Sequence, residues 1–366
     1  MPKKMMPDWF LLLVTAILVF IGLSMILSAS AGVSLEEHGH SYYFFWKQLL
    51  WAVVGFLGLA AAYFTDYTLY KRMALPLLGL SCLLLVLVLV PGIGSESGGV
   101  QRWFRVGMVS FQPSEMAKLS AIIFLAAAIS SPRIRIGEFW SGLLPPLMMV
   151  SSIIFLVLLE PDLGSALCIG AVTMILLYLG GARLTHLFLV VLATMPVFVV
   201  SILSEPYQKK RLMAFLDPWK DPSDSGFQII QSMVALGHGG LKGLGLGDGW
   251  QKLFFLPAAH TDFVLAVIGE ELGFLGILVV ILLFGIFWWR GMRIALHAPD
   301  GFGQALAMGI TVMIILQTAV NAGVVVGLLP TKGLPMPFLS YGGTSLAANL
   351  FSVGILLNIS HRCPES

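Results

Sequence analysis

Long apolar runs alternate with short polar segments along almost the whole chain. A helix needs about 20 apolar residues to cross a bilayer, and ten runs approach or exceed that length. These runs cover residues 9–29, 46–65, 74–90, 113–131, 142–160, 163–181, 184–204, 263–289, 302–329 and 338–360. The pattern predicts an all-α polytopic membrane protein with ten transmembrane helices in a single membrane domain, residues 1–366. A large loop, residues 205–262, is predicted between the seventh and eighth helices.

The composition supports a membrane protein and excludes some partners. Hydrophobic residues make up 58% of the chain and charged residues only 11%, whereas a soluble domain carries about 25% charged residues. The formal net charge is +2, and no basic cluster interleaved with aromatics is present, so no nucleic-acid partner is expected. The three cysteines show no metal-binding spacing. The first apolar run is too long for a signal-peptide core and is predicted to be the first span.

Lysine and arginine predict the orientation, because short cytoplasmic loops carry an excess of these residues. With the N-terminus inside, ten fall in short cytoplasmic segments: Lys3, Lys4, Lys71, Arg72, Arg133, Arg135, Arg183, Arg290, Arg293 and Arg362. Only four fall in short outer segments: Lys47, Arg102, Arg105 and Lys332. Both termini are therefore predicted to be cytoplasmic, and the loop at residues 205–262 extracytoplasmic.

The stretch "HTDF", residues 260–263, stands where the large loop enters the eighth run. Thr261 or Asp262 at this place is typical of a helix N-cap, whose side chain accepts a backbone N–H. The acid could instead take part in chemistry, so both interpretations stay open. Glu270 lies eight residues on, about 12 Å deeper along a helix, beside Glu271. We expect Glu270 inside the bundle with a polar partner or water, because an unpaired acid there is costly.

A second polar segment, "RWFRVGMVSFQPSEMAKLS", begins at Arg102 near the outer boundary. Glu115 and Lys118 are three residues apart, so an ion pair on the helix surface is the simplest interpretation. Lys118 nevertheless lies more than one turn into an apolar run. Together with Arg102 and Arg105 it supplies positive charge suited to an anionic headgroup.

A third segment, "LLPTKGLPMPFLSYGGTSL" at residues 328–346, interrupts the last two runs with three prolines and three glycines. Broken backbone at membrane depth is tolerated where it lines a cavity or is packed in protein. Lys332 lies in this break, and a purely structural kink is the alternative. Together the three segments combine a carboxylate, cations and broken helix ends on the outer side. That combination favours a site where a base meets a phosphate-bearing substrate.

Five motifs of the chain resemble those of the SEDS family (shape, elongation, division and sporulation). They are "QPSEMAKLS", "SGFQIIQSMVALGHGG", "GLGLG", "QKLFFLPAAHTDFVLAVIGEELGFLG" and "PTKGLPMPFLSYGGTSL", in the family's order and over nearly the whole chain. The fourth and fifth resemble the FtsW branch more than the RodA branch, and the sporulation branch is also close. Phe254 and Ala258 stand where family members often carry Glu, which places more weight on Asp262, Glu270 and Glu271.

The resemblance implies a peptidoglycan glycosyltransferase on the outer face of the bacterial cytoplasmic membrane. Such an enzyme polymerises lipid II, a disaccharide-pentapeptide on undecaprenyl diphosphate, into β-1,4-linked glycan strands. It implies septal synthesis during cell division, with elongation or sporulation as alternatives. The implied partners are a class B penicillin-binding protein transpeptidase, other divisome proteins and membrane lipids. No cofactor is certain, although a divalent cation (Mg²⁺ or Mn²⁺) would be compatible.

The family's catalytic acid falls on Asp262. Making a β-1,4 bond from an α-linked sugar diphosphate inverts the anomeric carbon, so one displacement suffices. It needs a base for the acceptor 4-hydroxyl and positive charge on the leaving diphosphate. We expect Asp262 to be that base, and Arg102, Lys118 and Lys332 to bind the diphosphate in one cavity with it. The other candidate substrate-binding residues are Glu115, His260, Glu270 and Ser340.

Two other classes of function are compatible with these features. A lipid II flippase or other transporter also uses broken helices and buried charges. It should, however, place polar residues near the membrane midplane and open to both sides. A scaffold that only recruits division proteins would leave the polar segments unexplained.

Overall fold

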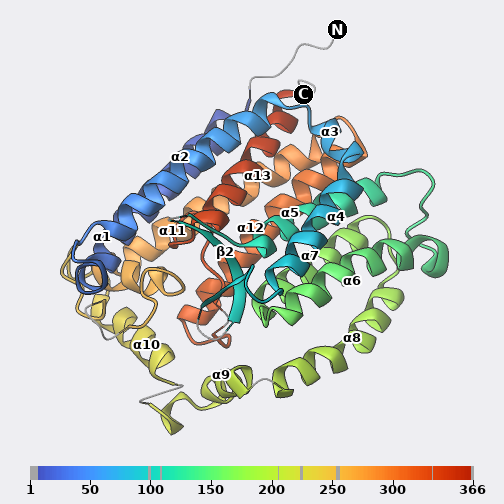
Figure 1. Ribbon diagram of the computed structural model, residues 1–366. Helices are drawn as coiled ribbons and strands as arrows, with labels where there is room; N and C mark the ends of the chain where they lie inside the picture. The colour runs from blue at the N-terminus through green and yellow to red at the C-terminus, as the bar shows by residue number, and fades with distance from the viewer. Residues whose placement is uncertain are drawn as a thin grey trace.

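Helices dominate the computed structural model, which describes residues 7–97, 100–107, 109–204, 206–222, 226–252, 256–331 and 333–363 (Figure 1). The α-helices are α1 (Trp9–His38), α2 (Tyr43–Phe64), α3 (Tyr67–Arg72), α4 (Ala74–Val88), α5 (Pro113–Ile129), α6 (Leu144–Leu159), α7 (Leu163–Leu179), α8 (Leu184–Ser204), α9 (Pro206–Leu216), α10 (Phe227–Gly239), α11 (Val264–Leu296), α12 (Gly301–Val325) and α13 (Gly343–His361). A π-helical turn, η1 (Phe139–Leu143), precedes α6, and a 3-10 turn, η2 (Pro218–Lys220), follows α9.

A helix occupies each of the ten predicted apolar ranges. Within the described ranges, seven helices are long and apolar enough to cross a membrane: α1, α2, η1 with α6, α8, α11, α12 and α13. The shorter helices α4 and α7 are also apolar. The helical membrane architecture is confirmed, and the count of ten crossings stays a prediction. The predicted loop at residues 205–262 holds the helices α9 and α10.

A small antiparallel sheet between α4 and α5 was not predicted. It consists of β1 (Ser95–Ser97), β2 (Val100–Val106) and β3 (Val109–Phe111), in the order β1-β2-β3. In the β2–β3 hairpin, Phe104 lies opposite Phe111 and Arg105 opposite Ser110. The sheet lies across one end of the bundle (Figure 1) and brings Arg102 to that end.

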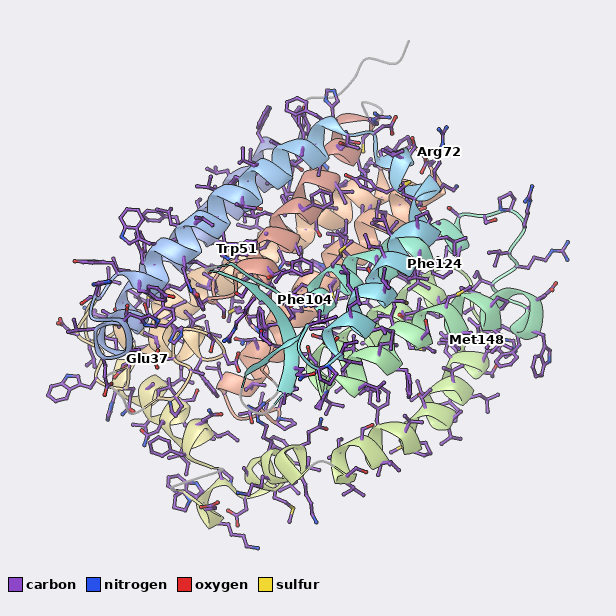
Figure 2. All side chains as sticks on the ribbon, viewed as in Figure 1. Glu37, Trp51, Arg72, Phe104, Phe124 and Met148 are labelled. Carbon is purple, nitrogen blue, oxygen red and sulfur yellow. The ribbon has the colours of Figure 1, made fainter. Side chains whose placement is uncertain are left out.

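The helices pack closely where small residues allow it. Helix α2 packs along α13, where a Cβ on Gly55 would collide with Leu350 and one on Gly354 would collide with the Leu59 backbone. Small residues serve this purpose in membrane bundles because apolar side chains gain little by leaving lipid. Large apolar side chains such as Met148, which is 64% exposed, point away from the bundle (Figure 2).

The two ends of the bundle differ in the chain segments that meet there. Both chain termini lie at one end (Figure 1), where the Asp8 N–H donates to Ser360 Oγ at 3.1 Å and Arg290 pairs with Asp8 at 2.7 Å. The N-termini of α5, α7, α11 and α13 meet at the other end. Hydrogen bonds link these starts, from Gln112 N to Thr344 Oγ1 at 3.2 Å and from Tyr341 N to the His260 carbonyl at 2.8 Å. Helix N-termini carry partial positive charge, so this end favours anions.

Helices α8 and α9 lie at the edge of the bundle (Figure 1). Helix α8 contacts α7 and α9, and most of its large apolar side chains are exposed. Helix α9 then turns back over the end that carries the helix starts, so these two helices cover the site described next.

Candidate functional site

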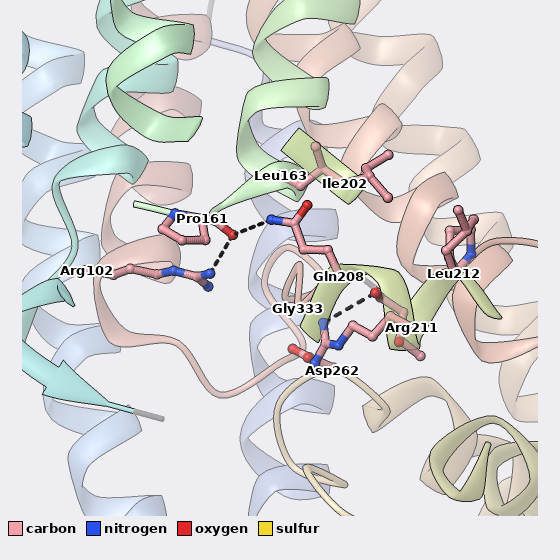
Figure 3. Close-up of a pocket in the computed structure, with 11 residues that line it drawn as sticks. Arg102, Pro161, Leu163, Ile202, Gln208, Arg211, Leu212, Asp262 and Gly333 are labelled. Carbon is pink, nitrogen blue, oxygen red and sulfur yellow. Dashed lines mark hydrogen bonds between the residues drawn. The ribbon is translucent and has the colours of Figure 1, made fainter. Parts of the chain in front are cut away.

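A cavity of about 460 Å³ lies at the end of the bundle opposite the termini. It is formed where β2, the α6–α7 turn, α8, α9, the start of α11 and the segment after α12 come together (Figure 3). Its lining residues are Arg102, Pro161, Leu163, Ile202, Gln208, Arg211, Leu212, Asp262, Pro330, Thr331 and Gly333. The volume suits a small-molecule site, because such pockets typically measure about 300–1,000 Å³.

Asp262 enters this cavity from a tight turn before α11. The Ala258 carbonyl accepts from the N–H groups of Thr261 and Asp262, at 3.1 and 3.2 Å. Asn321 of α12 donates to the carbonyls of Asp262 (2.8 Å) and Leu334 (2.9 Å), which ties the turn to the broken segment after α12. The N-cap of α11 is Phe263, and no side chain caps the helix. The interpretation of Thr261 or Asp262 as a cap is therefore wrong.

The carboxylate of Asp262 faces open space and positive charge. A Cβ on Gly333 would lie 3.6 Å from Asp262 Oδ2 and 3.9 Å from a terminal nitrogen of Arg211, so both groups approach the same point. Burial raises the pKa of Asp262 to about 6, with Asp162 adding to the rise and Arg211 and Arg102 opposing it. At neutral pH the group is mostly ionised, with a pKa close enough to neutrality for general-base chemistry.

Two arginines supply positive charge to the cavity while bonded to backbone carbonyls. Arg102 donates from Nε to the Glu160 carbonyl and from a terminal nitrogen to the Pro161 carbonyl, both at 2.6 Å. Arg211 donates to the Thr331 carbonyl at 3.3 Å (Figure 3). These carbonyl contacts hold the guanidinium groups at the cavity wall, and a guanidinium suits the oxygens of a phosphate.

Two further carboxyl groups stand behind Arg102 in the α6–α7 turn. Asp162 caps α7 by accepting from Ser165 N at 3.0 Å, and it also accepts from Ser114 Oγ at 3.4 Å. Glu160 is fully buried, and neither of its carboxyl oxygens has a hydrogen-bond partner among the described residues. Sequence reasoning did not single out these two acids, although a short connection that carries two acids beside an apolar run was itself a signal of polar function.

Glu115 and Lys118 lie elsewhere. They form a buried ion pair of 2.8 Å on α5, next to a separate small cavity lined by Gln317, Asn349 and Ser352. The expectation that Lys118 shares a cavity with Asp262 is wrong, because its side chain points into the bundle rather than toward the Asp262 cavity. The simpler interpretation as an i,i+3 pair is confirmed, although the pair is buried rather than on the surface.

Glu270 and Glu271 bind the loop at residues 244–252. Glu270 is fully buried and accepts from Trp250 N at 2.9 Å and Gln251 N at 3.1 Å. Glu271 Oε1 accepts from Lys252 Nζ and Ser28 Oγ, both at 2.6 Å. The expectation of a buried, partnered Glu270 is confirmed. Its acceptors are occupied by this chain, which makes it a positioning group rather than a substrate ligand.

The remaining candidates lie at the edges of the site. The His260 ring packs against Phe44 (centroids 4.9 Å apart) and Tyr341 (5.7 Å), and burial lowers its pKa to about 4. Ser340 Oγ accepts from Met336 N at 2.9 Å, which shapes the broken segment before α13. Lys332 lies outside the described residues, between the cavity-lining Thr331 and Gly333.

Arg211 and Gln208 were missed by sequence reasoning. Both belong to α9, inside the long loop to which the charge rule for short loops does not apply. The run "QKKR", residues 208–211, was the available signal, since three adjacent cations in an outer loop fit an anionic substrate.

Comparison with known proteins places these features in a family. The model of the FtsW/RodA/SpoVE family, described as "Cell cycle protein", matches residues 8–364. The chain is 47% identical to the probable peptidoglycan glycosyltransferase FtsW of Trichlorobacter lovleyi, over 96% of this chain and 93% of that protein. It is 43% identical to the stage V sporulation protein E of Bacillus subtilis, over 98% of both chains.

Two solved structures resemble the fold. One, described as "Structural coordination of polymerization and crosslinking by a peptidoglycan synthase complex", is 32% identical with a TM-score of 0.79, over 98% of this chain and 99% of that one. The other is the rod shape determining protein RodA of Thermus thermophilus, 28% identical with a TM-score of 0.73, over 98% of both chains. The similarity therefore extends over the complete helical architecture.

Proposed function

Because the chain belongs to the FtsW/RodA/SpoVE family of cell cycle proteins, we propose that it is a peptidoglycan glycosyltransferase that polymerises lipid II. It is an integral membrane protein, and it acts in septal cell-wall synthesis during cell division, a role supported by the relatives named FtsW and by the family description "Cell cycle protein". The observation that carries the proposal is one ionised carboxylate, Asp262, facing two arginines across a cavity that has room for a substrate.

The proposed reaction is a single displacement at the anomeric carbon of the donor disaccharide. The Asp262 carboxylate accepts the proton of the acceptor 4-hydroxyl as that oxygen attacks C1 of the donor. The bond from C1 to the diphosphate breaks, and the undecaprenyl diphosphate leaves with the electron pair. The configuration inverts from α to β, and no nucleotide is needed because the bond that breaks belongs to the donor.

The cavity suits the charge that develops on the leaving group. Arg102 and Arg211 line the cavity with Asp262 and bring positive charge to it. The helix starts at this end of the bundle add partial positive charge. Preorganised charge of this kind stabilises a leaving diphosphate without reorganisation during the reaction.

The walls of the cavity also suit a lipid-linked substrate. Leu163, Ile202 and Leu212 supply apolar surface, and the exposed helix α8 forms one side of the cavity. A polyprenyl chain could remain in the bilayer beside α8 while its diphosphate reaches Arg211. This arrangement explains why a reaction between polar sugars takes place at the end of a membrane-embedded helix bundle.

We propose that the site faces the outside of the cytoplasmic membrane and that a class B penicillin-binding protein transpeptidase is a partner, alongside other divisome proteins. The distribution of Lys and Arg in short loops supports a cytoplasmic position of both termini, and the cavity lies at the opposite end of the bundle (Figure 1). A structural neighbour belongs to a complex described as coordinating polymerization and crosslinking, which supports pairing with a crosslinking enzyme.

The test is polymerisation of fluorescent lipid II by the purified chain in proteoliposomes, with and without the transpeptidase. We expect long products that a muramidase digests, and none in protein-free vesicles. Movement of lipid II between leaflets without any polymer, with the partner present, would contradict the proposal and would favour the transporter.

A further inference from the structure

A second cavity, of about 560 Å³, lies beside the Asp262 cavity and shares no lining residue with it. The α1–α2 connection and the start of α2 form one side of this cavity, and the β2–β3 hairpin and Tyr341 form the other. Figure 2 labels Glu37 at the end of α1 and Phe104 on β2, the strand that also carries Trp103 and Arg105. The lining residues are Glu37, His38, Tyr43, Phe44, Lys47, Trp103, Arg105, Gly107, Ser110 and Tyr341.

Strand β2 is a common wall of the two cavities. Successive side chains of a strand point to opposite faces. Arg102 accordingly lines the Asp262 cavity, whereas Trp103 and Arg105 line the second cavity. The one strand therefore presents a phosphate-binding group to one side and an aromatic and a cation to the other.

The turn before α11 is the other common wall. Asp262 lines the first cavity, while the His260 ring packs on Phe44 and Tyr341, both of which line the second. The base of the proposed reaction is thus two residues away from the aromatic wall of the second cavity. A molecule that extends past the reacting group could reach both.

The second cavity has the chemistry of a saccharide site. Its aromatic side chains Tyr43, Phe44, Trp103 and Tyr341 are only partly buried. Flat aromatic surface of this kind packs against the C–H faces of sugar rings, while polar tips remain for hydroxyl groups. Lys47 lies 4.4 Å above the Tyr43 ring, and Arg105 is exposed. These two cations suit the carboxylates of a peptidoglycan strand.

We infer that the second cavity binds the glycan strand that extends from the reacting sugar in the Asp262 cavity. This inference rests on the proposed function, because a polymerase handles a chain longer than the unit it joins. The strand passes the common wall formed by β2 and His260, and the stacked pair His38–Tyr43 (centroids 3.7 Å apart) anchors its far side. The occupant is a carboxylate-bearing oligosaccharide.

Binding of a lipid-free fragment tests the inference directly. The probe is a fluorescent tetrasaccharide of two GlcNAc–MurNAc units with stem peptides, titrated against the full chain in nanodiscs. We expect Tyr43→Leu and, separately, Lys47→Gln to weaken binding by about tenfold, the change that about 1.4 kcal/mol produces. Tyr42→Leu is the matched control, since Tyr42 is 57% exposed, adjacent in sequence and absent from the lining.

Product length gives an independent readout. In lipid II polymerisation we expect Tyr43→Leu and Lys47→Gln to lower the ratio of long polymer to dimer, and Tyr42→Leu to leave that ratio unchanged. A variant that is merely destabilised loses all products in proportion. Wild-type fragment affinity in both variants, or a proportional loss of all products, would overturn the inference. Failure of the wild-type chain to make any polymer would instead overturn the proposed function.

Discussion

Two acidic regions at the start of α11 differ in how their charges are satisfied. Asp262 faces a cavity, and no described residue donates a hydrogen bond to its carboxylate; its charged neighbours Arg102 and Arg211 are bonded to carbonyls. Glu271, nine residues on, accepts from Lys252, Ser28 and Gly247, and Glu270 accepts from two backbone N–H groups. The first region has room for a substrate and the second is filled by the chain itself.

The region of Glu270 and Glu271 also contains a break in the helical backbone of α11, at Gly273. Gly273 has a φ of 67°, which favours glycine. The backbone carbonyls of Glu270 and Glu271, just before the break, accept from Leu244 N and Gly245 N, both at 3.0 Å. The two acids and this break attach the loop at residues 244–252 to the helix. Buried acids whose hydrogen-bond partners all come from the chain itself have a structural role. An acid such as Asp262, whose carboxylate faces a cavity and accepts no hydrogen bond from the described residues, is instead available for chemistry.

Changing Asp262 should produce the largest loss of activity. Asp262→Asn keeps the shape but removes the base, and a positioned base typically contributes 10²–10⁴-fold, so initial rates of lipid II polymerisation should fall by about that factor. Asp248→Asn is the control, because Asp248 is an exposed acid of the same loop.

Although Asp262→Asn should lose activity, its folded state should be as stable as that of the wild type or more stable. The pKa of this carboxyl rises from 3.8 to about 6 in the folded state, so folding disfavours the ionised form. Above about pH 6 that charge costs stability, and Asn removes the cost. Thermal unfolding at neutral pH should show an equal or higher melting temperature. A large drop would mean that Asp262 mainly supports the fold.

Changing Glu271 should affect stability more than chemistry. Glu271→Gln leaves Lys252, only 7% exposed, without its carboxylate, and breaking a buried pair costs about 3–5 kcal/mol. Denaturant unfolding in detergent measures the loss, and the rate per folded molecule should stay near wild type. The double variant with Lys252→Met should recover part of the lost stability. No recovery would argue against the pair as the cause.

Changing Arg211 should lower the catalytic efficiency of the Asp262 site without unfolding the protein. Charge-assisted hydrogen bonds contribute about 1.5–3 kcal/mol, so Arg211→Gln should lower kcat/KM by about tenfold to a hundredfold. Because Arg211 lowers the pKa of Asp262, its loss should also move the pH dependence of the rate to higher pH. An unchanged pH dependence would separate Arg211 from the base.

The smallest effect is expected at His260. Burial lowers the pKa of its ring to about 4, so it is neutral at physiological pH, and it packs between Phe44 and Tyr341. His260→Phe should cost less than about 1.5 kcal/mol of stability and leave polymerisation rates near wild type. A loss as large as that of Asp262→Asn would transfer the catalytic role to the histidine.

The sequence predicted the helices well because a bilayer dictates both their length and their apolar composition. It placed Asp262 and Arg102 correctly in one cavity, because the loop charges and the family resemblance assigned both to the outer side. It misplaced Lys118, because depth along a helix does not reveal which neighbour a side chain faces. It missed Arg211 because α9 lies in a loop to which no charge rule applies. The β2–β3 hairpin escaped prediction because its strands are short and border apolar helices.

The measurement that tests the central claim most directly is the pH dependence of the initial rate of lipid II polymerisation by the wild-type chain, from about pH 5 to about pH 8. A base must be deprotonated to act, and burial raises the pKa of Asp262 to about 6. The account predicts that the rate falls tenfold per pH unit below about pH 6, and that the residual rate of Asp262→Asn lacks this limb. A rate that stays flat across this range, or a limb that persists in Asp262→Asn, would contradict the assignment of Asp262 as the base.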